Sequence, residues 1–274
     1  MSAIRCGAYT ISLDHPRIVG ILNVTPDSFS DGGRFFDPAR AVAHALSMAR
    51  EGADIIDIGG ESTRPGSIRV SADEELRRIL PVLDALADEL AIPISLDTSK
   101  PEVADACLAR MPAIINDVYG LRDPAMREVI ARHQAPVIIM HMQGTPDTMQ
   151  KNPSYGDVVE EVIGYLGMQA QLARAAGIEQ IIIDPGIGFG KTITHNLLLL
   201  KHLDRFKRLG YPLMVGVSRK SFLQKILGAG SDDVLEGTLA ASVIAAYNGA
   251  DLIRVHDVAA VRRALAVANA IRNA

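Results

Sequence analysis

The sequence predicts an α/β fold of the (β/α)8 type, a TIM barrel, preceded by a short N-terminal strand or hairpin. Two observations support this prediction. From Ile18 onward, short β-branched runs alternate with amphipathic stretches, a pattern typical of a parallel sheet covered by helices. Eight such units occupy about 250 residues, which is the usual size of this barrel. A doubly wound open sheet is the alternative, although such sheets usually have fewer strands.

The expected strands are short, apolar and almost free of charge, as strands buried on both faces should be. The N-terminal strand or hairpin is expected at Ala8–Leu13. The barrel strands are expected at Ile18–Leu22, Ile55–Ile58, Ile92–Leu96, Ala113–Ile115, Pro136–Met140, Gln180–Ile183, Leu213–Val217 and Leu252–Val255.

The expected helices follow from capping residues, prolines and glycine stops. Aspartate–proline starts are expected at Asp37-Pro38 and Asp123-Pro124, and capping boxes at Ser71–Glu74 and Ser99–Glu102. The first helix should end near Glu51 and the second near Leu90. The later helices are expected at Asp157–Ala176, His195–Leu209, Ser231–Asn248 and Val258–Ile271.

Composition and charge narrow the class of protein. The chain has 274 residues, of which 48% are hydrophobic and 22% charged, and its net charge is −4. No linker interrupts the pattern, so we expect one domain over residues 1–274. The small charge gives no indication of a nucleic-acid partner, and no apolar run approaches the ~18 residues of a membrane span. Cys6 and Cys107 lie in no CxxC motif, so we expect a cytoplasmic protein without a disulfide framework or zinc site.

The loop after the first barrel strand is unusually long. It extends from Asn23 to Asp37, whereas such connections usually have ~2–6 residues. The pair Gly32-Gly33 makes it supple. We therefore expect a binding loop or a lid at this position.

Polar side chains occur at the strand ends where TIM barrels bind their substrates. Asp97, Asn116 and Asp184 supply carboxylate and amide acceptors there, a set suited to a flat heterocycle with several N–H groups. A lone aspartate after a strand is often only a helix cap, but Asp184 precedes Pro185 and no helix is expected to start there. Asp57 also lies at a strand end, without an assigned role.

Basic residues gather elsewhere on the same rim. Arg64 follows the second strand, and Arg254 and His256 belong to the eighth. Together with Asn23 and Thr63, they suit an anion such as phosphate or diphosphate.

The segment DPGIGFGKT resembles a phosphate-binding P-loop but has one residue too few between Gly186 and Gly190. The backbone N–H cradle of a P-loop depends on that spacing. We therefore expect a glycine loop that brings Phe189 and the backbone against a planar ligand.

The chain resembles the dihydropteroate synthase family over nearly everything from Ile18 to Val258. The matching blocks are GILNVTPDSFSDGG, DIGGESTRPG, SLDTSKPEV, INDVYGL, MHMQGTP, DPGIGFGKT, GVSRKS and IRVHDV. The resemblance implies condensation of 6-hydroxymethyl-7,8-dihydropterin diphosphate with 4-aminobenzoate to 7,8-dihydropteroate and diphosphate, in folate biosynthesis. It also implies Mg2+ as cofactor and a homodimer packed through the late helices.

The resemblance further implies roles for individual residues, beginning with Asn23 as the Mg2+ ligand. The residues that would bind the pterin diphosphate are Thr63, Asp97, Asn116, Met140, Asp184, Phe189, Gly216, Lys220, Arg254, Val255 and His256. Those that would bind 4-aminobenzoate, at a site which sulfonamides also occupy in this family, are Phe29, Pro65, Arg219 and Ser221. Those expected to act in catalysis are Asn23, Asp31, Arg64, Lys220, Arg254 and His256.

The implied chemistry needs no strong general base, because the amine of 4-aminobenzoate is already neutral at pH 7. We expect diphosphate to depart first, assisted by Mg2+ and the basic residues. The aniline nitrogen then attacks the pterin methylene group. Asp31 would offset the cation, and Phe29 would exclude water that otherwise captures it.

Other functions remain open at this point. A pterin-dependent methyltransferase would share the barrel and the heterocycle site, but would not need the long first loop or the basic residues. A Schiff-base aldolase would use Lys220. A metal-dependent hydrolase usually has His-x-His at the first strand end, where this chain has Asn23-Val24-Thr25. A non-catalytic homologue would bind pterin or act as an assembly subunit.

Overall fold

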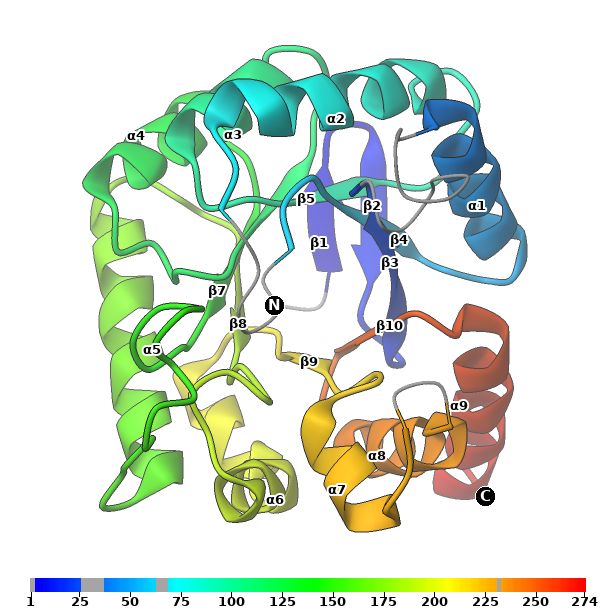
Figure 1. Cartoon of the computed structure of the whole chain (residues 1–274), viewed down its shortest axis with the longest axis vertical. Helices are drawn as coiled ribbons and strands as arrows, with labels where there is room; N and C mark the ends of the chain where they lie inside the picture. Colours follow the sequence, from blue (N-terminus) through cyan, green and yellow to red (C-terminus); the bar gives the residue numbers. More distant parts are fainter. Residues whose placement is uncertain (1–2, 26–36, 63–68, 231–232) are drawn as a thin grey trace.

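The computed structural model of the chain describes residues 3–25, 37–62, 69–230 and 233–274. Within these ranges, eight parallel strands form a barrel surrounded by helices (Figure 1). The strands are short and largely buried, as expected for a parallel sheet covered by helices. They are β3 (Arg17–Asn23), β4 (Ile55–Gly59), β5 (Ile94–Asp97), β6 (Ile114–Asp117), β7 (Val137–Met140), β8 (Ile181–Asp184), β9 (Met214–Gly216) and β10 (Leu252–Val255).

The sheet closes on itself. Hydrogen-bonded neighbours follow the order β8-β7-β6-β5-β4-β3-β10-β9, and a parallel bridge between Ile183 and Leu213 joins its two ends. The predicted barrel is therefore confirmed, and the open doubly wound sheet is excluded.

The amino end of the barrel is apolar and covered by the N-terminal hairpin, which is also confirmed. Strand β1 (Ala3–Cys6) pairs antiparallel with β2 (Tyr9–Ser12). The hairpin residues Ile4, Cys6 and Ile11 pack against buried residues at the start of the barrel strands. Those residues are Val19, Ile55, Ile114, Ile138, Ile182, Met214 and Leu252. The carboxyl end is therefore the end where polar side chains can face a ligand.

The helices pack their apolar faces against the outside of the barrel in one continuous core. They are α1 (Pro38–Arg50), α2 (Ala72–Leu86), α3 (Pro101–Leu108), α4 (Pro124–His133), α5 (Val158–Ala175), α6 (Ile193–Lys201), the 3-10 helix η1 (Leu203–Leu209), α7 (Ser221–Leu227), α8 (Leu235–Tyr247) and α9 (Val258–Arg272). Among the described helices, none combines the length and apolar character that a membrane crossing requires.

Of the four helix starts that were predicted from capping residues, three are confirmed and one is wrong. The side chains of Asp37, Ser71 and Asp123 each accept a hydrogen bond from a backbone N–H of the first turn. The capping box expected at Ser99–Glu102 is absent, because Lys100 is the N-cap of α3 and makes no side-chain cap bond. A proline at the first position begins this helix instead, since its fixed φ suits a helix start.

The helices predicted between residues 195 and 248 differ from those observed. The stretch 195–209 contains two elements, α6 with its cap at Thr192 and η1 ending before Gly210. The sequence pattern does not predict α7, whose seven residues are too few to show a helical period. The helix expected from residue 231 begins at Leu235, and residues 231–232 lie outside the described ranges.

Candidate active site

Buried polar side chains gather at the carboxyl end of the barrel. Asp57 on β4, Asp97 on β5 and Asn116 on β6 lie on three neighbouring strands. Asp184 is the last residue of β8. All four are buried, and Asp57 is 0% exposed. Four buried acceptor groups in an otherwise apolar interior need partners, because an unpaired buried polar group is costly.

Arg254, on β10, connects the first two of these carboxylates. Its Nε donates to Asp57 Oδ2 at 2.6 Å, and its Nη2 donates to Asp97 Oδ2 at 2.8 Å. The amide nitrogen of Asn116 donates to the same Asp57 oxygen at 3.1 Å. Asp57 thereby fixes the orientation of the Asn116 amide, whose carbonyl oxygen is left to accept from a ligand.

Burial changes the protonation of this site. It raises the pKa of Asp97 to about 7, against the opposing charge of Arg254. It raises the pKa of Asp184 to about 6, against the Gly186 N–H and the charge of Lys220. Burial would lower the pKa of Arg254, but the carboxylates of Asp57 and Asp97 raise it overall. A ligand with N–H groups would therefore favour the ionised carboxylates by hydrogen bonding to them.

The backbone after β8 fixes Asp184. The N–H of Gly186 donates to Asp184 Oδ1 at 2.7 Å. Gly186 has φ +67°, and a Cβ atom there would lie 1.9 Å from the carbonyl oxygen of His141. Only glycine fits this position, so the glycine loop brings the N–H that orients the carboxylate.

Apolar groups line the site next to these acceptors. The ring of Phe189 packs in a cluster with the buried Met140, and the Lys220 ammonium is 4.1 Å from the centroid of that ring. Gly216 lies beside Arg254, and a Cβ atom there would be 3.7 Å from the arginine Cβ. These predicted pterin neighbours therefore surround the same end of the barrel as the acceptors.

Basic and polar groups follow β9 and β10. His256 Nδ1 and Ser218 Oγ are 3.1 Å apart, and the backbone N–H of His256 donates to the same hydroxyl. Arg219 pairs with Asp257 at 2.7 Å. Asn23 ends the neighbouring strand β3, which pairs with β10.

The remaining predicted residues divide into two groups. Val255 is the buried last residue of β10, and Ser221 is the first residue of α7. The others lie outside the described residues, so their predicted roles remain predictions: Phe29, Asp31, Thr63, Arg64 and Pro65.

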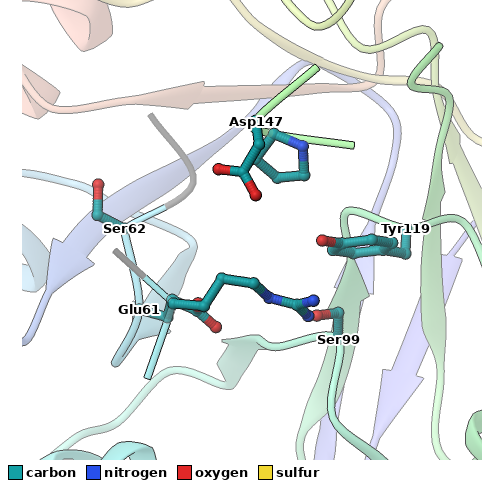
Figure 2. A pocket seen from close by; sticks show the side chains of 7 residues that line it. Glu61, Ser62, Ser99, Tyr119 and Asp147 are labelled. Atoms are coloured by element: carbon teal, nitrogen blue, oxygen red, sulfur yellow. The ribbon is translucent and has the colours of Figure 1, made fainter. Parts of the chain in front are cut away.

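A small hollow lies among the loops that follow β4 to β7. Figure 2 shows Glu61, Ser62, Ser99, Tyr119 and Asp147 around it. Arg69 also lines it, with its guanidinium 5.5 Å from the centroid of the Tyr119 ring. None of the acceptor groups lines this hollow, and Ser62 at its edge directly precedes the predicted Thr63 and Arg64 in the sequence.

Asp57 is the site residue that sequence reasoning located without giving it a role. The only signal was a carboxylate inside the apolar run Ile55–Ile58. Its partner Arg254 is 197 residues away along the chain, so the pair is visible only after folding.

The fold and the site define a pterin-binding barrel, and comparisons with known proteins agree. The family profile described as "Pterin binding enzyme" matches residues 19–256. Dihydropteroate synthase of Escherichia coli strain K12 is 48% identical over 97% of this chain and 95% of its own length. The chain belongs to the dihydropteroate synthase family.

Solved structures show the same similarity. Dihydropteroate synthase of Yersinia pestis, solved with a sulfonamide drug complex, has a TM-score of 0.95 and 42% identity, covering 99% of this chain and 100% of its own. The Xanthomonas albilineans enzyme in complex with 7,8-dihydropteroate has a TM-score of 0.91 and 43% identity, covering 99% of both chains.

The role of Asp57 can be tested by Asp57→Asn. The substitution removes the charge that pairs with Arg254, so we expect the KM for the pterin substrate to rise about tenfold or more, as for loss of a charged hydrogen bond. The KM for 4-aminobenzoate should change little. Steady-state kinetics with each substrate varied in turn measures both values.

Asp117→Asn is the matched control for that experiment. Asp117 is buried at the end of β6, and among the described residues its carboxylate accepts only from the backbone N–H groups of Tyr119 and Leu121. It should lose stability without a change in pterin KM. An equal rise of both KM values in Asp57→Asn would contradict the assigned role.

Asp184→Asn tests the electrostatic cost of the site. The folded-state pKa of Asp184 is raised to about 6, so the carboxyl group ionises first in the unfolded chain and the contribution of Asp184 to wild-type stability falls as the pH rises from about 4 to about 6. Relative to wild type, the variant should gain unfolding free energy over this range, by up to about 3 kcal/mol, and should lose pterin binding. Urea unfolding at a series of pH values measures the difference.

The exposed Asp88 provides the comparison, because Asp88→Asn is the same substitution at a position outside the buried site. A constant difference between Asp184→Asn and wild type from pH 4 to pH 8 would show that burial of Asp184 has no such cost.

Proposed function

We propose that the chain condenses 6-hydroxymethyl-7,8-dihydropterin diphosphate with 4-aminobenzoate to form 7,8-dihydropteroate and diphosphate. The observation that carries this proposal is the convergence of Asp97, Asn116, Asp184, Lys220 and Arg254 at one end of the barrel. Relatives support the choice of substrates, because structures of the Xanthomonas albilineans family member contain 4-aminobenzoic acid and 7,8-dihydropteroate.

The buried acceptors are suited to the pterin ring. Asp97 and Asp184 accept from its N–H groups, and the Asn116 carbonyl oxygen adds a third acceptor. Because each acceptor is fixed by a partner inside the protein, the ring enters a prearranged site, and little ordering has to occur on binding. Met140 and Phe189 lie against the ring faces.

The leaving diphosphate requires positive charge at the open rim. Arg254 provides part of it, and we propose that Arg64 adds to it while His256 and Thr63 donate hydrogen bonds to the phosphate oxygens. Charge-assisted hydrogen bonds to phosphate oxygens strengthen as the C–O bond breaks and negative charge develops on the leaving group.

The residues present fit a Mg2+ ion held mainly by substrate. Asn23 is half-buried at the end of β3, and its side chain makes no hydrogen bond within the described residues. Among those residues there is no group of three His, Cys, Asp or Glu side chains that can hold a metal. Mg2+ commonly uses one or two protein oxygens together with substrate phosphates and water. When bound, the ion would neutralise charge on the departing diphosphate.

The second substrate approaches from the rim formed by α7 and its neighbours. Arg219 and Ser221 lie at the start of α7, and we propose that they border the 4-aminobenzoate site together with Phe29 and Pro65. The protein does not have to remove a proton from the neutral amine before it attacks. Asp31 is proposed to stabilise the pterin cation until the nitrogen reaches it.

Two further features belong to this proposal. Cys6 and Cys107 are buried free thiols, as expected of a protein that acts in the reducing cytoplasm. The whole chain, residues 1–274, acts as a single pterin-binding domain.

We also propose a homodimer. Figure 1 shows α7, α8 and α9 grouped at one side of the barrel. The exposed apolar residues on these helices are Ile226, Leu227, Leu235, Ile244, Tyr247, Val267 and Ile271. Large exposed apolar patches mark interaction sites, and a second copy of the chain would cover this one.

A coupled turnover assay tests the proposed reaction. Purified protein with pterin diphosphate, 4-aminobenzoate and Mg2+ should release diphosphate and 7,8-dihydropteroate in equal amounts, and chelation of Mg2+ should lower the rate. Binding of pterin without any turnover would instead support a non-catalytic homologue. Methyl transfer from a methyl-folate donor would support a methyltransferase.

Ile244→Asp tests the dimer. Ile244 is 51% exposed on α8, and a buried aspartate at a dimer contact should raise the dissociation constant about tenfold or more, as for an interface hot spot. Met168→Asp is the matched control, since Met168 is also 51% exposed but lies on α5. Sedimentation equilibrium measures both, and a wild-type monomer at micromolar concentration would refute the dimer.

A further inference from the structure

The glycine loop after β8 contains a buried lysine that the proposed reaction does not use. Lys191 is 3% exposed, and lysine is almost never this buried without partners. Its Nζ lies 2.8 Å from the Phe189 carbonyl oxygen, 2.9 Å from His141 Nδ1 and 3.5 Å from the His141 carbonyl oxygen. Three acceptors therefore converge on one nitrogen that can donate three hydrogen bonds.

His141 is the acceptor in its contact with Lys191. Burial, together with the charges of Lys191 and Arg122, lowers the pKa of His141 to about 2. The ring is therefore neutral, and its Nδ1 can accept from the lysine while Nε2 carries the proton. Lys191 thus has a complete set of partners inside the protein, and phosphate binding is not its role in this structure.

We propose that Lys191 is a positioning residue for the pterin site, because it ties the glycine loop after β8 to the end of β7 and so fixes Phe189. The inference rests on the proposed function, since it assigns Lys191 to the same site.

The backbone of this loop requires an interaction that holds it in place. Gly186, Gly188 and Gly190 all have positive φ, between +63° and +85°, and glycine has more conformational freedom to lose than any other residue. The loop lies directly on the segment after β7, because a Cβ atom on Gly190 would be 2.8 Å from the Gln143 carbonyl oxygen. Gln150 and Tyr155, from the segment after β7, also bind this loop, at the carbonyl oxygens of Gly188 and Gly190. Among the described residues, Lys191 is the side chain that binds the carbonyl oxygen of Phe189 itself and connects it to His141.

Fixing the Phe189 carbonyl also fixes its ring. The ring contacts Lys220, whose Nζ is 4.1 Å from the ring centroid, and packs in the cluster that contains Met140. Both of these residues are predicted to contact the pterin. A shift of the loop would therefore change the shape of the ring-binding surface more directly than the rim that receives 4-aminobenzoate.

Lys191 also acts on the acceptor at the end of β8. Burial lowers the pKa of Lys191 to about 7, against the opposing charge of Asp184, and the ammonium form in turn lowers the pKa of Asp184 against the effect of burial, which favours the ionised acceptor. The position of Phe189 and the charge of Asp184 thus both affect the pterin, and neither affects the second substrate directly.

Lys191→Met is the first test, because it removes the ammonium group while keeping most of the side-chain volume. We expect the Kd for 6-hydroxymethylpterin and the KM for pterin diphosphate to rise about tenfold or more, as for loss of hydrogen bonds to a charged group. The KM for 4-aminobenzoate and the kcat per folded site should change little, because only uniform binding of the pterin is lost. Lys201→Met, at an exposed position on α6, is the matched control.

A residue with only a structural role would give a different result. Its substitution would lower the melting temperature and leave both KM values of the folded fraction unchanged, and that outcome overturns the inference. An equal rise of both KM values overturns it as well.

Lys191→Arg decides the question if the Met variant does not fold. Arginine keeps the charge, but its planar fork cannot bring one nitrogen to three converging acceptors. A selective rise in pterin KM is again expected, and an unchanged value overturns the inference. Wild-type protein assayed in the same experiment separates the two proposals. Absence of wild-type turnover would refute the proposed reaction. Normal pterin KM values in the variants would refute only the role of Lys191.

Discussion

The buried ion pairs of Arg254 with Asp57 and Asp97 are the interaction on which the site depends. Transfer of each charge from water into the barrel costs several kcal/mol, so the three groups persist there only as a set. Arg254 stands on β10 and its partners on β4 and β5, with β3 between them in the sheet. The arginine therefore links strands that are not neighbours and brings the acceptors to fixed positions before any ligand arrives.

This arrangement is possible because the two ends of the barrel differ in composition. The amino end is filled by apolar side chains and covered by the hairpin β1–β2, whose buried side chains add hydrophobic stabilisation. At the carboxyl end, burial is unfavourable for the polar side chains. It raises the pKa values of Asp97 and Asp184, which shows that the ionised carboxylates are destabilised there. Burial of apolar side chains thus stabilises the fold at the amino end, whereas burial of carboxylates destabilises it at the carboxyl end. Hydrogen bonds from a bound ligand to these carboxylates would offset that cost.

The parts of the structure that were predictable from sequence are those determined by local signals. The barrel was predictable from the periods of its strands and helices and from the capping residues Asp37, Ser71 and Asp123. These signals act within a few residues along the chain. The rule that barrel sites lie at strand ends located Asp97, Asn116 and Asp184. The partners of these side chains were not predictable, since Arg254 pairs with residues 157 and 197 positions away. Short helices such as α7 were also not predictable, because seven residues are too few to show a clear helical period.

The glycine loop after β8 shows that the role of a residue in this protein depends on its place in the fold more than on the motif that contains it. Its sequence ends in Gly-Lys-Thr like a P-loop, yet Lys191 faces the interior and binds Phe189 and His141. A reaction in which a cation forms and a neutral amine attacks leaves little for an acid or a base to do, so its rate depends on how well the two substrates are placed and how the departing charge is stabilised. In such an enzyme, a buried lysine or aspartate that never touches the reacting atoms can still determine how well the pterin is bound and placed, because it fixes the residues that contact the ring.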